Sequence, residues 1–121
     1  MTIFTYVGPQ TGGAALDNVR TSTVFAGTGA NTLTLNSTHD IILATTTGGA
    51  GNIQLPNPAL AVNLNHFWTV VDTGGVFEAT PITLLRFAAE QIRGVAASYE
   101  LRTNFGMWTF WNDGVNWWFI A

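Results

Sequence analysis

Few side chains in this sequence could carry out acid–base or metal chemistry. His39 and Asp40 form the only adjacent acid–base pair, and both stand at the start of an apolar run, where a capping role is far commoner than general-base catalysis. His66 precedes Phe67 and Trp68, and we expect it to be a half-buried strand residue. Two histidines without closely spaced second ligands make no metal signature, and a chain without cysteine has no thiolate. We therefore expect no metal and no cofactor.

The glutamates are the remaining candidates for catalysis. Sugar hydrolysis requires two carboxyl groups about 5 to 10 Å apart, but nothing in the glutamate spacing selects such a pair. Arginines lie close enough in sequence to be their salt-bridge partners, and ion pairs between chains are the simpler interpretation. The residues concerned are Glu78, Glu90, Glu100, Arg86, Arg93 and Arg102. The glycine-rich run 48–51 leads into an expected strand and is therefore no phosphate loop. We expect the protein not to be an enzyme.

Charge is scarce along the whole chain. Of its 121 residues 47% are hydrophobic and only 9% are charged, with no lysine and a net charge of −3; an average soluble domain has about 25% charged residues. Charged groups are depleted in the cores of interfaces because they are costly to desolvate. The composition therefore favours a protein that assembles with copies of itself, the alternative being a monomer with a neutral surface. Without a basic cluster, nucleic-acid binding is not expected.

No membrane segment is expected either. No run approaches eighteen apolar residues. The first residues lack the basic segment and long apolar stretch of a secretory signal, so we expect the protein to be made and folded in a cytoplasm.

Short β-branched and aromatic runs between glycine, proline and asparagine turns predict an all-β fold. We expect a single compact β-sandwich or barrel of about ten short strands, with one short turn of helix after Pro58 and no convincing internal repeat. Residues 1–39 would supply an N-terminal arm and the first strands, and residues 40–121 a β module in the same domain. The expected strands are residues 3–7, 23–26, 32–35, 40–46, 52–56, 66–72, 81–87, 91–95 and 98–102, followed by the last hairpin.

The C-terminal sixteen residues hold four of the five tryptophans around Asp113 and Gly114. An Asp-Gly pair between aromatic runs predicts a β-hairpin with a type I′ turn. Trp117 and Trp118 are adjacent, so in a strand they face opposite sides, one toward the core and one toward a second surface. We expect subunit packing at this hairpin; packing inside one chain and an aromatic shelf for sugars are the alternatives. The candidate packing residues are Trp108, Phe110, Trp111, Trp117, Trp118 and Phe119.

A second turn is expected after the run 67–71. Gly74 and Gly75 supply the unusual backbone angles of a tight reversal, and Asp72 can cap the turn through its side chain. Pro56 ends an earlier strand because proline lacks the donor that a ladder needs.

The order of these motifs resembles a module of tailed-bacteriophage structural proteins, found in capsid decoration proteins and tail-fibre segments. The resemblance covers about residues 40 to 120. It rests on an apolar strand ending in Leu55-Pro56, a Val71-Asp72-x-Gly-Gly turn before an Ile-Thr strand, the Ile92-x-Gly94 step, and the terminal aromatic Asp113-Gly114 hairpin.

The resemblance implies a homotrimeric virion protein. We expect a capsid decoration or cement protein that binds the major capsid protein on the outside of a phage head and stabilises the shell, with residues 1–20 reaching the shell. The alternative is a tail-fibre or receptor-binding tip protein that recognises a host-surface glycan. A free lectin or carbohydrate-active enzyme is a third interpretation.

Overall fold

The computed structural model describes residues 20–120. The expected strand at 3–7 and most of the expected N-terminal arm lie outside these residues. The described part is β-rich, with nine strands and one 3-10 helix. In chain order they are β1 (Ser22–Ala26), β2 (Thr32–Thr34), β3 (Ile41–Thr45), β4 (Gly51–Gln54), η2 (Ala61–Asn63), β5 (Trp68–Asp72), β6 (Ile82–Leu85), β7 (Tyr99–Leu101), β8 (Met107–Asn112) and β9 (Trp117–Ile120).

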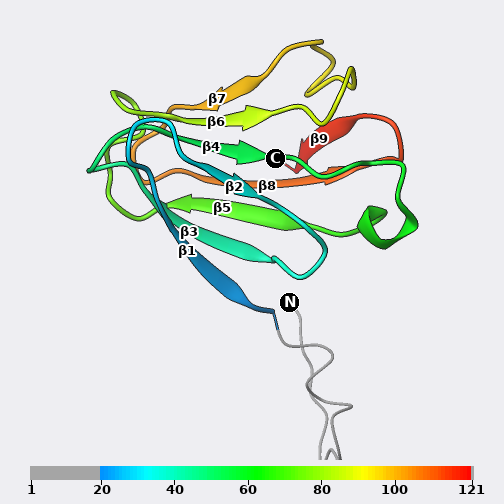
Figure 1. The fold of residues 1–121 in the computed structure, drawn as a ribbon, viewed down its shortest axis with the longest axis horizontal. Coiled ribbons are helices and arrows are strands. Elements are labelled where there is room, and N and C mark those ends of the chain that lie inside the picture. Colours follow the sequence, from blue (N-terminus) through cyan, green and yellow to red (C-terminus); the bar gives the residue numbers. More distant parts are fainter. Residues whose placement is uncertain (1–19, 121) are drawn as a thin grey trace, which may run out of the picture.

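The strands form two mixed sheets whose first parts are parallel (Figure 1). One sheet has the order β1-β3-β5-β8-β9 and the other β2-β4-β6-β7. Consecutive strands from β1 to β6 alternate between the sheets, and β1-β3-β5 and β2-β4-β6 pair in parallel. Residues 20–120 therefore wind through three stacked coils of a β-solenoid. At the last coil β7 and the β8–β9 hairpin add antiparallel strands.

This stacking is a structural repeat that the sequence does not reveal. Ser22 pairs with Ile41 in the next coil, and Ile41 pairs with Thr69 in the coil after that. The second of these intervals along the chain is clearly the longer, because the connection from β4 to β5 carries η2. The sequence shows no convincing internal repeat because the coils differ in length, although their strands stack in register.

One core lies between the sheets. Inward side chains from both sheets form a single buried cluster, which agrees with the sandwich alternative. The sheets do not close into a barrel, so that alternative is wrong; the edge strands β1 and β2 begin the two sheets instead of pairing with β9 and β7. The expected strand at 91–95 is reduced to isolated bridges of Ile92 with Val95 and Trp117. The helical turn expected after Pro58 is present as η2.

Close backbone contact holds the first coil on the second. The amide of Gly27, just after β1, donates to the carbonyl of Thr45 over 2.8 Å, and that of Gly29 donates to Ala50 over 2.7 Å. A Cβ at Gly27 would overlap the carbonyl oxygen of Gly49 and lie 2.9 Å from the carbonyl carbon of Ala50. Only glycine fits this corner, because both neighbours are backbone atoms.

Two core tryptophans differ in how their indole N–H groups are satisfied. Trp68 and Trp117 are both fully buried, and their rings lie 5.4 Å apart. The indole of Trp68 donates to the carbonyl of Asn36 over 3.0 Å, which ties β5 to the loop after β2. The indole N–H of Trp117 has no acceptor among the described residues.

We predict that Trp68→Phe destabilises the protein by about 1–2 kcal/mol more than Trp117→Phe. Both changes remove the same atoms from buried sites, but only the first breaks a hydrogen bond and leaves a carbonyl unsatisfied. Urea unfolding of the two variants measures the difference. Equal losses of unfolding free energy would contradict the assigned role of the Asn36 contact.

Candidate functional site

The outward face of the five-stranded sheet is largely apolar, and its strand positions within residues 20–120 include no charged residue. Alternation along each strand turns one set of side chains to the core and the other outward. The strand register lines up Val24, Leu43, Val71 and Met107 in one row across β1, β3, β5 and β8. We call this surface the apolar face. Its outward positions are Ser22, Val24, Ala26, Ile41, Leu43, Thr45, Thr69, Val71, Met107, Thr109, Trp111, Trp118 and Ile120.

Three of the four hydroxyl groups on the apolar face, those of its threonines, lie within hydrogen-bond distance of neighbouring hydroxyls. Thr69 on β5 and Thr109 on β8 stand opposite one another in the register, and their hydroxyl oxygens lie 2.9 Å apart. The hydroxyl of Thr45 lies 3.3 Å from that of Thr47. Because these groups already have partners, covering the face with another apolar surface costs little in lost hydrogen bonds to water.

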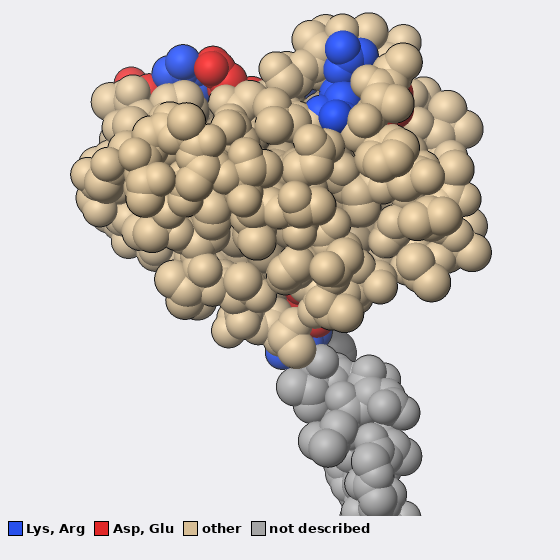
Figure 2. Space-filling view, viewed as in Figure 1, with Lys and Arg blue, Asp and Glu red and all other residues tan. Residues whose placement is uncertain are grey.

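The other sheet presents a polar outer surface. Its register places Thr32, Asn52, Thr83 and Glu100 in one row, so β2, β4, β6 and β7 expose hydroxyl, amide and carboxylate groups. Charge is sparse over the molecule as a whole. On the side seen in Figure 2, charged side chains lie only near the upper and lower margins, with an uncharged expanse between them. The two sheets therefore differ in polarity more than in charge.

The six aromatic residues proposed for subunit packing divide between core and surface. Phe110 and Trp117 have no exposed surface, so neither can reach a second chain. Trp108 and Phe119 are partly buried and pack against the core. Only the outward neighbours in β8 and β9 belong to the apolar face, where Trp111 pairs with Trp118, which is 38% exposed.

The turn between β8 and β9 has four residues, not two, so the type I′ expectation is wrong. Gly114 has a φ of +96°, but Asp113 is not among the residues with positive φ. The Asp113 carboxylate instead accepts hydrogen bonds from the amides of Val115 and Asn116 and, over 2.9 Å, from the indole of Trp118. The Asn116 amide first, then the indole and the Val115 amide, hold the pKa of Asp113 below its usual value. This carboxylate fixes Trp118 at the edge of the apolar face.

Asp72 caps the reversal after β5 from a buried position. Its side chain is 2% exposed and accepts four backbone hydrogen bonds. One oxygen accepts from Gly74 and Gly75 over 3.0 and 2.8 Å. The other accepts from Phe77 and Phe105 over 3.1 and 3.0 Å. The carboxylate thus joins the end of β5 to the segment that leads into β8.

Gly75 has a φ of +74°, and the ring of Phe105 lies over it where a Cβ would stand. A side chain at Gly74 would overlap the hydroxyl of Thr45. Both glycines of this turn therefore have steric reasons to be glycine.

His39 and Asp40, the acid–base pair singled out in the sequence, each make hydrogen bonds to other segments of the fold or to neighbouring turn residues. Asp40 accepts hydrogen bonds from the amide and hydroxyl of Thr21 over 2.8 and 3.1 Å, and its other oxygen lies 3.2 Å from Nε2 of His66. Nδ1 of His39 accepts from the amide of Asn36 over 3.0 Å. The two imidazoles thus contact different partners, and these contacts join the start of β1 to the loops before β3 and β5.

The structure does not join the three glutamates and three arginines into one network. Arg102 pairs with Glu100 over 2.8 Å. Glu90 instead accepts hydrogen bonds from the amides of Phe87 and Ala88. Among residues 20–120, Arg93 has no carboxylate within 4.0 Å, so a salt bridge with a glutamate of its own chain is wrong for this arginine.

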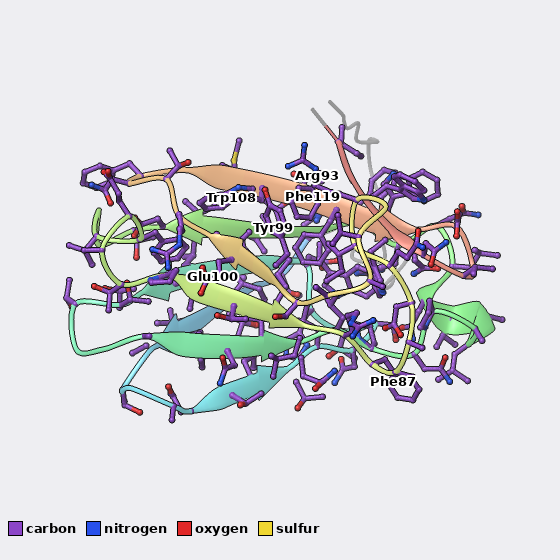
Figure 3. The ribbon with its side chains drawn as sticks, turned by 90° about the horizontal axis from the view of Figure 1, so that it is seen from above. Phe87, Arg93, Tyr99, Glu100, Trp108 and Phe119 are labelled. Carbon is purple, nitrogen blue, oxygen red and sulfur yellow. The ribbon has the colours of Figure 1, made fainter. Side chains whose placement is uncertain are left out.

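Arg93 lies over aromatic rings at the edge of the molecule. Its guanidinium carbon is 5.6 Å from the ring centres of both Tyr99 and Phe119, and Nη1 donates to the Tyr99 hydroxyl over 2.8 Å. These residues line a groove of about 330 Å³ together with Met107 and Trp108. Figure 3 shows Arg93, Tyr99, Trp108 and Phe119 gathered where β7 faces the β8–β9 hairpin. We call this site the arginine groove.

No protein-family model and no curated protein matches this chain. Within residues 20–120 there is no group of three or more metal-ligating side chains. No helix in that part of the chain has the length and apolar content needed to cross a bilayer.

Sequence reasoning missed both surfaces in their observed form. The apolar face depends on parallel pairing, which brings Val24, Leu43 and Val71 side by side although they come from three distant runs. The arginine groove depends on the turn at Arg93 and Gly94. The signal available was the Ile92-x-Gly94 step, which marks a turn but does not show where its side chain points.

Proposed function

We propose that this protein is a structural subunit that associates with copies of itself through the apolar face. The observation that supports this proposal is a five-stranded sheet whose outward positions include no charged residue. A face without charge meets its own copy without like-charge repulsion, whereas a charged face is suited to an oppositely charged partner. The role is mechanical, with no catalytic step.

The size of the apolar face agrees with this role. Five strands about 4.8 Å apart and about 17 Å long cover roughly 400 Å², and the largest apolar patch on a typical monomer is about 300–600 Å². Phe67 and Phe105, next to β5 and β8, are also exposed, and the guanidinium of Arg20 donates to the Phe67 carbonyl over 3.1 Å, which puts one charge at that end of the sheet. A standard interface uses about 800 Å² per partner, so the strands alone supply about half of that area.

The order of the sequence motifs suggests the particle in which this subunit acts. Because residues 40 to 120 resemble the phage module, we propose a homotrimeric virion protein, and as its function a decoration or cement protein that stabilises the head. Shell lattices repeat each contact many times, so a weak contact becomes effective through multivalency. A tail-fibre or receptor-tip protein that recognises a glycan is the second candidate, and the arginine groove favours it.

We predict that Val71→Lys converts the assembly to a monomer. Val71 lies in the middle of the apolar face between Leu43 and Met107, so a lysine there must be desolvated when the apolar faces of three subunits gather around a threefold axis. Light scattering over a range of concentrations should give about three times 13.0 kDa for the unaltered protein and about 13.0 kDa for the variant.

Asn52→Lys is the matched control, because it adds the same charge to the polar outer surface of the other sheet. This variant should keep the native mass. An unaltered protein that is monomeric at every concentration would overturn the proposal. Equal dissociation of both lysine variants would show that the subunit contact does not lie on the apolar face.

A further inference from the structure

The turn that carries Arg93 breaks a local conformational rule. Ile92 and Val95 exchange two backbone hydrogen bonds, of 2.9 and 3.1 Å, around two central residues. Both central residues have positive φ, +55° at Arg93 and +81° at Gly94. Such a turn favours asparagine, aspartate or glycine at its first central position, and a long side chain there is strained. Strain of this kind concentrates at binding sites.

The surroundings hold this arginine in one place. The amide of Arg93 donates to the carbonyl of Trp117 over 2.9 Å, which anchors the turn to β9. The guanidinium carbon lies over the rings of Tyr99 and Phe119, 5.6 Å from each ring centre, which is within the distance of a favourable cation–π contact. The side chain is therefore preorganised before any ligand arrives.

Most of the donors on Arg93 have no protein acceptor. A guanidinium carries five N–H groups, and among residues 20–120 only one, on Nη1, donates to a side chain, that of Tyr99. The edge formed by Nε and Nη2 can donate two parallel hydrogen bonds to a carboxylate, the geometry that arginine favours. The Tyr99 hydroxyl accepts from Arg93 and keeps its own proton for a further hydrogen bond.

We infer that the arginine groove binds a carboxylate-bearing sugar residue. The groove of about 330 Å³ is at the small end of ligand pockets, which suits one ring. Its walls combine one cation with the aromatic surfaces of Trp108, Tyr99 and Phe119, which contact the C–H face of a sugar. A groove with a single cation, in a chain of net charge −3, suits a single carboxylate better than a phosphate polymer. The site lies within one protomer; Met107 is the one lining residue that it shares with the apolar face, and the other four do not belong to that face.

The test uses Arg93→Asn, because asparagine suits the positive φ and should leave the variant at least as stable to heat as the unaltered protein. Methyl glucuronide and methyl glucoside are titrated while NMR follows the Arg93 Nε–H and the Trp108 indole N–H. We expect saturable shifts with the glucuronide, at least tenfold weaker binding of the glucoside, and at least tenfold weaker glucuronide binding by the variant. Arg102→Asn is the control, since Arg102 already pairs with Glu100, and it should bind normally.

Three outcomes would overturn the inference. Absence of NMR shifts at millimolar glucuronide would show that the groove does not bind this sugar. Equal glucuronide binding by the Arg93→Asn variant would show that Arg93 takes no part in the binding. Acetate bound as tightly as the glucuronide would show that the groove recognises a carboxylate without the sugar ring.

Discussion

Replacement of Asp72 by asparagine is expected to lower the free energy of unfolding by about 3 kcal/mol or more. Each oxygen of the buried carboxylate accepts two backbone hydrogen bonds. An asparagine keeps one oxygen and turns an NH₂ group toward the other two amide donors. Two buried N–H groups then lose their acceptor and face a donor instead. Since small domains unfold with about 5–15 kcal/mol, urea denaturation would show the loss clearly.

Asp113→Asn is the matched control for this change. Asp113 also caps backbone amides, but it is exposed, so water can replace the lost hydrogen bonds. We expect this variant to lose about 1 kcal/mol or less. Similar losses at both positions would show that burial is not what makes the Asp72 cap important.

Gly27→Ala is expected to release the first coil from the second at a cost of about 1–3 kcal/mol. The added methyl would overlap backbone atoms of Gly49 and Ala50, which cannot move aside as the end of a flexible side chain can. Amide hydrogen exchange should show faster exchange at amides that bond between the first two coils, such as Gly27 and Gly29, than in β5 and β8, because β1 lies at the edge of its sheet.

Gly48→Ala tests whether the effect is specific. A Cβ at Gly48 would meet one atom, the Gly27 carbonyl oxygen, at 3.2 Å, so a small shift accommodates it. This variant should exchange nearly as slowly as the unaltered protein. Unchanged exchange in Gly27→Ala would mean that the corner is less closely packed than these distances indicate.

The sequence predicted where strands lie but not how they pair. Thr32–Leu35 and Asn52–Leu55 alternate in the way that a half-buried strand requires, and both segments contain strands of the structure. Strand direction is not encoded in a single run, because parallel and antiparallel strands share the same period of two. Here each parallel partner is reached through a strand of the other sheet, so neighbours in sequence are not neighbours in a ladder.

The candidate surfaces were predictable only in part. Alternation alone requires Trp117 and Trp118 to face opposite sides, and the structure places the first in the core and the second partly exposed. Sequence distance offered Arg93 as a salt-bridge partner of a glutamate, with an ion pair between chains as the simpler interpretation. The turn of Arg93 instead carries it to the aromatic rings of Tyr99 on β7 and Phe119 on β9, the second of which is far away along the chain.

Because the coils stack on one another, the molecule can be lengthened by adding whole coils. The step along the chain from Thr32 to its partner Asn52 is nearly equal to the step from Ser22 to its partner Ile41. Insertion of one further coil of that size between β2 and β3 would lengthen the solenoid by about 4.8 Å, the spacing of neighbouring strands. The hairpin end, with its arginine groove, would stay unchanged while the apolar face gained one strand. Evolution or design can therefore change the length of this fold in uniform steps without rebuilding its hairpin end.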